Sequence, residues 1–486
     1  QRQQSPTRSS ANDSIPRRHA APPMTNTVDQ SGLLRPMLRL AMPVLAEQLL
    51  NMLVGLVDTW LAGRYLEQPH LAAIGLMSYV LWLLPAMFAA VAIGATALVS
   101  RFTGARDRTS VDQATHQAFV LGALAAVLAT LVAAIGYVRF IDIMQLQGDA
   151  RPLALHYTRY LLPVIPAIMI QQVGVACLHG AGDTVTGLVV MTIVNVVNVA
   201  ISTTLVIGLG PAPQLGWTGL AIGTATAHVV GAVLILAALI RGRAGLSLRL
   251  SLLRPDWSMM RRLLRIGVPG GLDMAAILFC HLWYLSIINA LGTVEAAPHG
   301  LGVRSESLAF LPGSAFQVAA ATLAGQALGA GDPRRASRGV WLSVLVGGSL
   351  MCAAALAFFF AGDWLTRLFL GRHSLDVARL TVPLLKIVAF STPPLAVAMI
   401  LFGGLRGAGD TRGPLAITIT GLLVVRIPLA YWFAYEQTTL PLLGITLPGL
   451  GLSVIGAWYA MLIDTVVRTL LTLLRFWRGK WRELVV

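Results

Sequence analysis

Charged side chains are scarce in this sequence. Only 12% of its 486 residues are Asp, Glu, Lys or Arg, whereas 56% are apolar. Soluble domains carry about 25% charged residues. A chain of this composition cannot cover its apolar surface with polar groups, so it needs lipid around it. The shortage of charge therefore excludes an ordinary soluble protein and predicts an integral membrane protein.

Lysine is almost absent, because only Lys386 and Lys480 occur. A nucleotide-binding Walker A loop ends in Gly-Lys-Ser/Thr, and neither lysine is followed by Ser or Thr. The HExxH and GxSxG motifs are missing as well. The sequence thus gives no support to an ATP-driven pump or to the familiar hydrolases. We predict no enzyme activity and no cofactor.

Cysteine is also rare. The three cysteines, Cys177, Cys280 and Cys352, each lie in an apolar run, and no CxxC pair is present. Neither a disulfide framework nor a metal site is indicated. We interpret the cysteines as small core residues.

Long apolar runs are what the sequence does have. Residues 1–30 are polar and rich in proline without an apolar core, which predicts a disordered tail over 1–36. Stretches of about 20 apolar residues are long enough to span a bilayer. Twelve such spans are predicted, at 37–62, 71–100, 113–138, 153–178, 187–208, 217–240, 266–291, 299–328, 339–361, 377–404, 414–435 and 451–472.

The basic residues are distributed unevenly across these spans. Of the 36 Lys and Arg residues, 26 fall on the side of the N-terminus, 7 on the other side and 3 within spans. Cytoplasmic loops carry the excess of basic residues. We therefore expect a multi-pass protein of the bacterial plasma membrane with both termini in the cytoplasm, including a tail at 473–486. The basic loop at 241–265 is interpreted as a cytoplasmic linker, and a nucleic-acid site there is the weaker alternative.

The chain repeats itself at a nearly constant offset. Arg39-Leu-Ala-Met-Pro43 recurs as Arg265-Ile-Gly-Val-Pro269, and Gly180-Ala-Gly-Asp-Thr184 recurs as Gly407-Ala-Gly-Asp-Thr411. The offsets are 226 and 227 residues. Because six spans is an even number, both halves start on the same side of the membrane. Parallel repeats of this kind are typical of transporters that rock two bundles about a central cavity. We predict an N-lobe at 37–240 and a C-lobe at 266–472.

These landmarks resemble the multidrug and toxic compound extrusion (MATE) family, in particular its DinF-like prokaryotic branch. The residues that carry the resemblance are Val57-Asp58-Thr59-Trp60 in the first span, the paired Gly-Ala-Gly-Asp-Thr loops, and the segment Ala297–Asp332. The resemblance implies an all-α, V-shaped pair of six-helix lobes. It also implies export of amphipathic or cationic small molecules in exchange for H+ or Na+. We expect a monomer that needs no nucleic-acid partner.

Polar residues in the first span point to a coupling site. Gln48 (or Glu47), Asn51 and Asp58 recur at helical spacing and should share one face, which lipid would penalise. A carboxylate within a span is costly unless it is paired or protonated, so it indicates function. We predict that Asp58 is the coupling group and that Gln48 and Asn51 line the cavity. A wetted Asp58 at the mouth of the span is the alternative.

Depth along the helices places other polar groups near Asp58. At about 1.5 Å per residue, Ser202 and Thr224 reach the same outer layer, with Asn198 just beneath. These oxygens could bind Na+ or surround a protonated carboxylate. Hydrogen bonding between helices is the simpler alternative for all three.

The resemblance assigns Asp58, Asn198 and Thr224 to the family's N-lobe coupling site. Ser202 stands where members usually carry Asp or Asn, which weakens a Na+ site and favours H+. Asp273 in the seventh span is a further candidate for the cavity lining. Asp464 and Arg468, four residues apart in the last span, are interpreted as an ion pair.

Two other functions stay open at this point. A flippase for lipid-linked saccharides on a related two-lobe plan is the alternative within transport, although such proteins tend to have more spans or more intramembrane cations. A membrane enzyme or receptor is the alternative from another class, although no catalytic dyad or metal cluster is found in the sequence.

Overall fold

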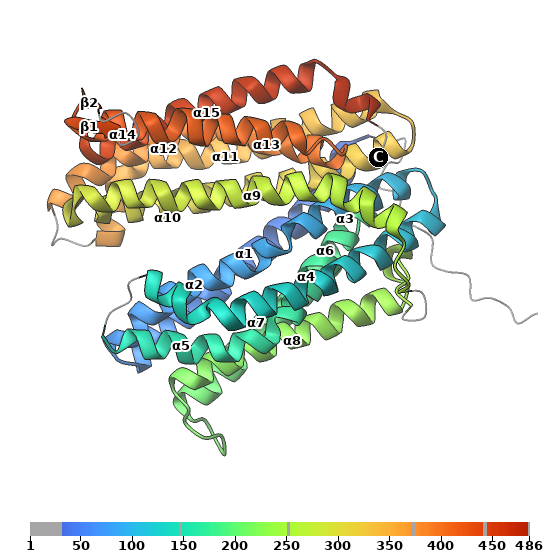
Figure 1. Cartoon of the computed structure of the whole chain (residues 1–486), viewed down its shortest axis with the longest axis horizontal. Helices are drawn as coiled ribbons and strands as arrows, with labels where there is room; N and C mark the ends of the chain where they lie inside the picture. Colours follow the sequence, from blue (N-terminus) through green and yellow to red (C-terminus); the bar gives the residue numbers. More distant parts are fainter. Residues whose placement is uncertain (1–31, 145–147, 250–252, 371–374, 441–444, 485–486) are drawn as a thin grey trace, which may run out of the picture.

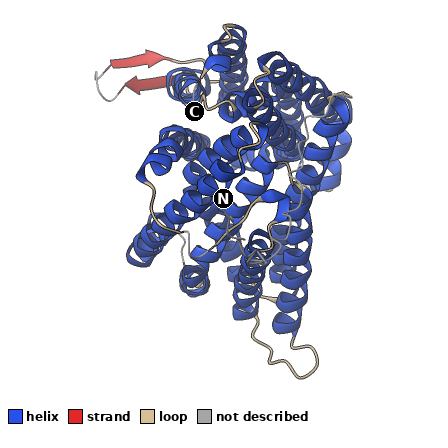
Figure 2. Ribbon diagram, turned by 90° about the vertical axis from the view of Figure 1, so that its right-hand side faces the viewer, coloured by secondary structure: helices blue, strands red, loops and turns tan. Residues whose placement is uncertain are grey.

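The computed structural model describes residues 32–144, 148–249, 253–370, 375–440 and 445–484. Nearly all of these residues are helical, and the described part of the chain contains a single β-hairpin (Figures 1 and 2). Twelve of the described helices are long and apolar enough to cross a membrane. The prediction of an all-α membrane protein with twelve spans is confirmed.

Two spans of the first half are interrupted. The second span consists of α2 and α3, which meet at Phe88, three residues after Pro85. The fourth consists of α5 and α6, joined by a 3-10 turn that contains Pro163. Proline lacks an amide hydrogen and disrupts helical hydrogen bonding around it. The helices of this half are α1 (Leu34–Tyr65), α2 (Gln68–Met87), α3 (Ala89–Gly104), α4 (Arg108–Ile143), α5 (Ala150–Leu161), α6 (Ile165–Ala181), α7 (Val185–Ile207) and α8 (Trp217–Ile240).

The second half follows the same order with one irregular span. The eleventh span of the chain contains a π-helical segment, Thr420–Arg426, between α13 and α14. Strands β1 (Gln437–Leu440) and β2 (Ile445–Pro448) pair antiparallel, with Gln437 opposite Pro448. The helices are α9 (Trp257–Leu291), α10 (Thr293–Gly329), α11 (Pro333–Leu370), α12 (Leu375–Gly407), α13 (Arg412–Ile419), α14 (Ile427–Ala434) and α15 (Ser453–Trp477).

Several helices extend beyond the predicted apolar spans. Helix α9 already begins at Trp257, inside the range 241–265 assigned to the linker, because the Asp256 side chain accepts from the amides of Ser258 and Met259. Trp481 is buried, although it lies in the predicted tail at 473–486. A hydropathy scan cannot detect helix outside the apolar segment. Most of the predicted tail at 1–36 lies outside the described residues.

The two halves form two groups of helices that converge on one side and diverge on the other (Figure 1). We call the side where α1 begins and α15 ends the terminal side, and the opposite side the open side. Figure 2 views the molecule from the terminal side.

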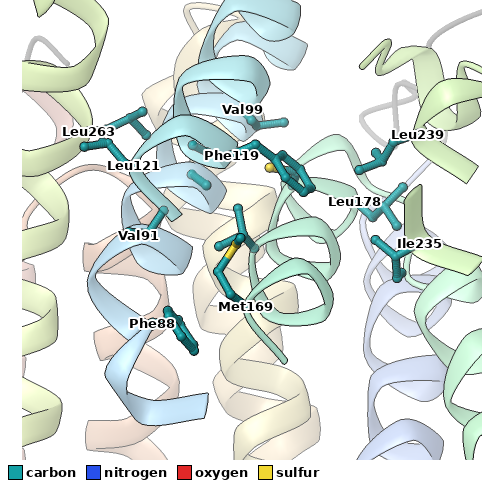
Figure 3. Packing of buried hydrophobic residues seen from close by; sticks show 14 of the residues in the cluster. Phe88, Val91, Val99, Phe119, Leu121, Met169, Leu178, Ile235, Leu239 and Leu263 are labelled. Carbon is teal, nitrogen blue, oxygen red and sulfur yellow. The ribbon is translucent and has the colours of Figure 1, made fainter. Parts of the chain in front are cut away.

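The first helix of each half crosses to the opposite lobe on the terminal side. The start of α1 contributes Met37 and Leu40 to a core cluster with residues of α10 to α13. Reciprocally, the start of α9 contributes Met260 and Leu263 to the N-lobe core, where Leu263 lies near Val91 and Leu121 (Figure 3). This exchange buries apolar surface between the lobes and joins them on the terminal side.

Glycines allow the closest approach between the lobes. A Cβ added to Gly104 on α3 would lie 1.9 Å from the carbonyl oxygen of Gln326 on α10. One added to Gly267 on α9 would lie 2.1 Å from the carbonyl oxygen of Ala90. Only glycine permits such backbone contact. The terminal side is therefore sealed by backbone packed against backbone.

We expect Gly104→Ala to separate the lobes on the terminal side. The added methyl group overlaps the Gln326 carbonyl, and overpacking costs about 1–3 kcal/mol. Spin labels at the exposed positions Thr109 and Arg334 would report the separation as a longer distance. Gly136→Ala on α4 is the matched control, because no described atom lies within 4 Å of its added Cβ. Equal distances in the two variants would contradict the backbone seal.

Candidate coupling site

Asp58 lies on α1, toward the open side, and is only 1% exposed. The alternative of a carboxylate wetted at the mouth of the span does not fit this burial. Helices α7 and α8 cover Asp58, with Asn198 from α7 and Thr224 from α8 also fully buried. The structure therefore brings together three of the residues that the sequence predicts for the coupling site.

Thr224 organises this site through its hydroxyl group. It donates to Asp58 Oδ2 at 3.1 Å, and it accepts from Asn198 Nδ2 at 3.3 Å and from the Tyr157 hydroxyl at 3.1 Å. A threonine hydroxyl has one hydrogen to donate and two lone pairs to accept with. All of its capacity is therefore used, and it orients the carboxylate of Asp58 between α5, α7 and α8.

Three oxygens of the site have no hydrogen-bond partner among the described residues. They are Asp58 Oδ1, Asn198 Oδ1 and Ser202 Oγ, and all three are buried. Buried polar atoms are normally paired, since an unpaired one costs about 1–3 kcal/mol. A carboxylate, an amide and a hydroxyl oxygen together suit a small positively charged species, which is either a proton on Asp58 or a hard cation.

Ser202 joins the site because α8 carries a glycine beside it. A Cβ on Gly223 would lie 2.1 Å from Ser202 Oγ. The absence of a side chain at Gly223 lets α7 pack closely against α8, as small residues do in membrane helix pairs. Ser202 is thereby held next to Thr224, the neighbour of Gly223 in the chain.

Sequence reasoning missed Tyr157. This residue lies on α5 with its ring fully buried and its hydroxyl bound to Thr224. Depth is the signal that could have found it, because Tyr157 lies about 6 Å from the outer end of the predicted span 153–178. Tyr157 belongs to the fourth span, whereas the site predicted from the sequence draws on the first, fifth and sixth spans.

The candidates for the cavity lining are placed differently from one another. Gln48 is half-buried and Asn51 is exposed. The polar face predicted for the first span is therefore not covered by neighbouring helices at Asn51. The prediction that Asp273 lines the cavity is wrong. Its side chain is 0% exposed and forms an ion pair with Arg406 of α12. Burial of both charges is tolerated because each neutralises the other.

Charged residues of the C-lobe spans form a buried network. Asp464 accepts from Arg468 at 2.9 Å, which confirms the predicted pair, and also from Arg426 at 2.8 Å. The guanidinium of Arg426 lies over the ring of Tyr284, 5.7 Å from its centroid. Glu306 is half-buried in the electrostatic field of both arginines. This network joins the π-helical segment Thr420–Arg426 of the eleventh span to α15.

Comparison with known proteins decides the family. The model of the MatE family matches residues 43–204 and 269–432, and the two matches begin 226 residues apart, as the internal repeat does. The chain belongs to the MatE family. It is a multi-pass membrane transporter and not an enzyme, and the family predicted from the sequence is confirmed.

Relatives and solved structures agree with this assignment. The chain is 28% identical over 455 residues to the probable multidrug resistance protein NorM of Thermotoga maritima, and the alignment covers 93% of each chain. It is 27% identical over 413 residues to the multidrug resistance protein MdtK of Pectobacterium atrosepticum, which covers 83% of this chain and 88% of the relative.

The fold matches solved transporters at low sequence identity. A multidrug resistance MATE family transporter of the MOP superfamily, solved in an outward-facing conformation, superposes with a TM-score of 0.84 at 20% identity. A MOP superfamily transporter from Pyrococcus furiosus superposes with a TM-score of 0.83 at 21% identity. Both comparisons cover 93% of this chain and 97% of the other. They confirm the predicted two-lobe fold.

Proposed function

We propose that this MatE family member is a secondary antiporter that exports amphipathic or cationic small molecules in exchange for H+ by alternating access. The observation that carries the proposal is the buried Asp58, one of whose carboxylate oxygens is bound to Thr224 while the other has no partner among the described residues. Enclosing a carboxylate within a membrane span costs free energy. Its presence there therefore indicates that it binds and releases a cation during transport.

The orientation follows from the charge distribution. In the predicted topology, 26 of the 36 basic residues belong to the side of the N-terminus, so we assign the terminal side to the cytoplasm of a bacterial cell and place both termini there. The lobes are packed together on that side and diverge on the other (Figure 1). In this orientation the structure is an outward-facing state, and Asp58 lies in the half of the membrane nearer the exterior.

Protonation of Asp58 would change how the N-lobe packs. A proton on Oδ1 gives the carboxyl group a hydrogen to donate, and Asn198 Oδ1 and Ser202 Oγ of α7 both have free acceptor capacity in the described structure. The protonated form thus draws α1 toward α7, whereas the ionised form leaves the charge uncompensated. A ligand that favours one packing shifts the population toward it. Proton binding and substrate release are coupled through this shift.

Na+ is the second candidate for the coupling ion, favoured by the three unpartnered oxygens of the site. A hard cation taken out of water prefers several oxygens that include full negative charge. Asp58 supplies the only formal charge among Asp58, Asn198, Ser202 and Thr224. H+ coupling therefore has the stronger support.

Multidrug substrates are proposed from the printed names of the relatives NorM and MdtK, which are called multidrug resistance proteins. These names do not favour the flippase alternative. We further propose that the protein acts as a monomer, because each lobe and the seal between them are complete within one chain.

We expect a pH gradient to drive substrate efflux from Na+-free proteoliposomes that contain the purified protein. Ser202→Asp should add a Na+ requirement, because it gives the site a second carboxylate. Ser202→Asn, which adds an amide of the same size without charge, is the matched control and should keep the H+ coupling. Efflux from the unmodified protein that requires Na+ and ignores the pH gradient would replace H+ by Na+ in this proposal.

A further inference from the structure

The repeat relates two buried pairs of charged side chains, one in each lobe. In the N-lobe, Oε2 of Glu47 lies 3.4 Å from Nε2 of His179, and both side chains are buried. In the C-lobe, Asp273 pairs with Arg406. The offsets between the corresponding members are 226 and 227 residues, the same as for the repeated motifs. The two pairs are therefore equivalent positions that carry different chemistry.

The difference lies in whether the base can lose its proton. An arginine keeps its charge at any physiological pH, so the pair of Asp273 and Arg406 stays closed. A histidine changes its charge between about pH 5 and pH 8. When the N-lobe pair holds one proton, Glu47 and His179 attract each other. When it holds none, a neutral imidazole lies beside the carboxylate, and the attraction between opposite charges is lost in a buried site.

The backbone around His179 forms part of the seal between the lobes. Its carbonyl oxygen accepts from Thr322 Oγ1 of α10 at 2.9 Å. The next carbonyl, that of Gly180, accepts from Gln326 Nε2 at 3.1 Å. Both donors belong to the C-lobe. A movement of His179 away from Glu47 therefore acts on two hydrogen bonds that hold the lobes together.

We propose that Glu47 and His179 form a second proton-binding site, which holds one proton between the two side chains and thereby keeps the terminal side sealed. The proposal rests on the antiport function proposed above, because it assigns the lobes two alternative arrangements. Loss of the proton separates α6 from α1 and weakens the seal. Since the terminal side is assigned to the cytoplasm, a more alkaline cytoplasm would favour opening toward it.

Other titratable groups near the pair are already engaged. On α3 the only charged residue is Arg101, which donates to the carbonyl of Leu484. On α8 the only titratable residue is His228, whose Nδ1 lies 2.8 Å from Gln171 Oε1.

The remaining neighbours supply no competing charge to the pair. On α4, His116 contacts the Asp112 carbonyl and the Arg249 amide. In the loop after α6, Asp183 pairs with Arg243 at 2.7 Å. Helix α7, whose Gly187 packs against the pair, has no charged residue in its sequence, nor has the part of α10 from Ala309 to Gly329. The pH response assigned to the pair can therefore be separated by mutation from that of its surroundings.

The test measures the seal directly and not transport. Spin labels at Thr109 and Arg334, in a chain whose three native cysteines are changed to Ala, report the distance across the terminal side by electron resonance in lipid nanodiscs. Asp58→Asn is included in every sample, so that the coupling site cannot respond to pH. We expect the ratio of short to long distances to fall as the pH is raised, by up to about tenfold per pH unit for one proton.

Variants then show which residues cause the pH response of the distance ratio. His179→Arg copies the C-lobe pair and should keep the short distance at every pH, and Glu47→Gln should remove the pH response as well. His228→Asn, a second buried histidine of the same lobe, should keep the response. A pH-independent ratio in the Asp58→Asn background would overturn the proposal, as would a response that survives both His179→Arg and Glu47→Gln. The antiport proposal is tested separately. Normal H+-driven efflux by the single variant Asp58→Asn would contradict that proposal and would leave the distance measurement unaffected.

Discussion

Changing Asp58 to Asn is expected to abolish gradient-driven export while leaving the protein folded in the membrane. Asn has the same shape and keeps an oxygen for the Thr224 hydroxyl, but it cannot bind a proton at the transport site. Burying an ionised carboxylate costs free energy that a neutral amide does not require. We therefore expect efflux to fall to the level of protein-free liposomes, with thermal stability equal to or above that of the unmodified protein.

The matched control is Asp149→Asn, which removes an exposed carboxylate before α5. It should transport at the unmodified rate. Efflux by Asp58→Asn at the unmodified rate would remove Asp58 from the coupling mechanism. Failure of Asp58→Asn to insert or fold would instead assign Asp58 a structural role.

The largest loss of stability is expected from Asp464→Asn. This carboxylate is 0% exposed and pairs with Arg426 at 2.8 Å and Arg468 at 2.9 Å. Its removal leaves two buried guanidinium groups without a countercharge, and breaking a buried pair typically costs about 3–5 kcal/mol. Thermal unfolding of the detergent-solubilised protein would measure the loss.

Asp142→Asn provides the comparison, since it breaks an ion pair with Arg151 in which both side chains are more than 40% exposed. Exposed pairs contribute at most about 1 kcal/mol. If the two variants unfold at the same temperature, the buried network around Asp464 does not stabilise the C-lobe.

The two lobes differ at the position of the coupling group. The repeat offset of 226 places Tyr284 where the N-lobe has Asp58. Tyr284 lies under the guanidinium of Arg426. Neither the phenol of a tyrosine nor a guanidinium gains and loses a proton near neutral pH, as a buried carboxylate can. The same asymmetry recurs at Glu47 and His179, whose C-lobe counterparts form a permanent ion pair. At these repeat positions the N-lobe carries titratable groups, and the C-lobe carries a phenol and a fixed charge pair.

The sequence alone determined the features that depend on local composition and order. Apolar runs specify twelve spans because lipid requires helices of fixed length. The constant offset between repeated motifs predicted two parallel lobes, and depth along the helices predicted that Asp58, Asn198 and Thr224 lie together. The inference from depth uses only the rise per residue and the direction of each span.

Only the tertiary structure decided which neighbour each side chain meets. Depth gives a residue's level in the membrane but not the direction in which its side chain faces. For this reason Asp273 is predicted to line the cavity, although it pairs with Arg406. The exchange of the first helices between lobes depends on which surfaces pack, as does the seal of Gly104 against Gln326. Contacts between segments more than a hundred residues apart arise when the whole bundle packs, because helical periodicity fixes a face and leaves its partner open.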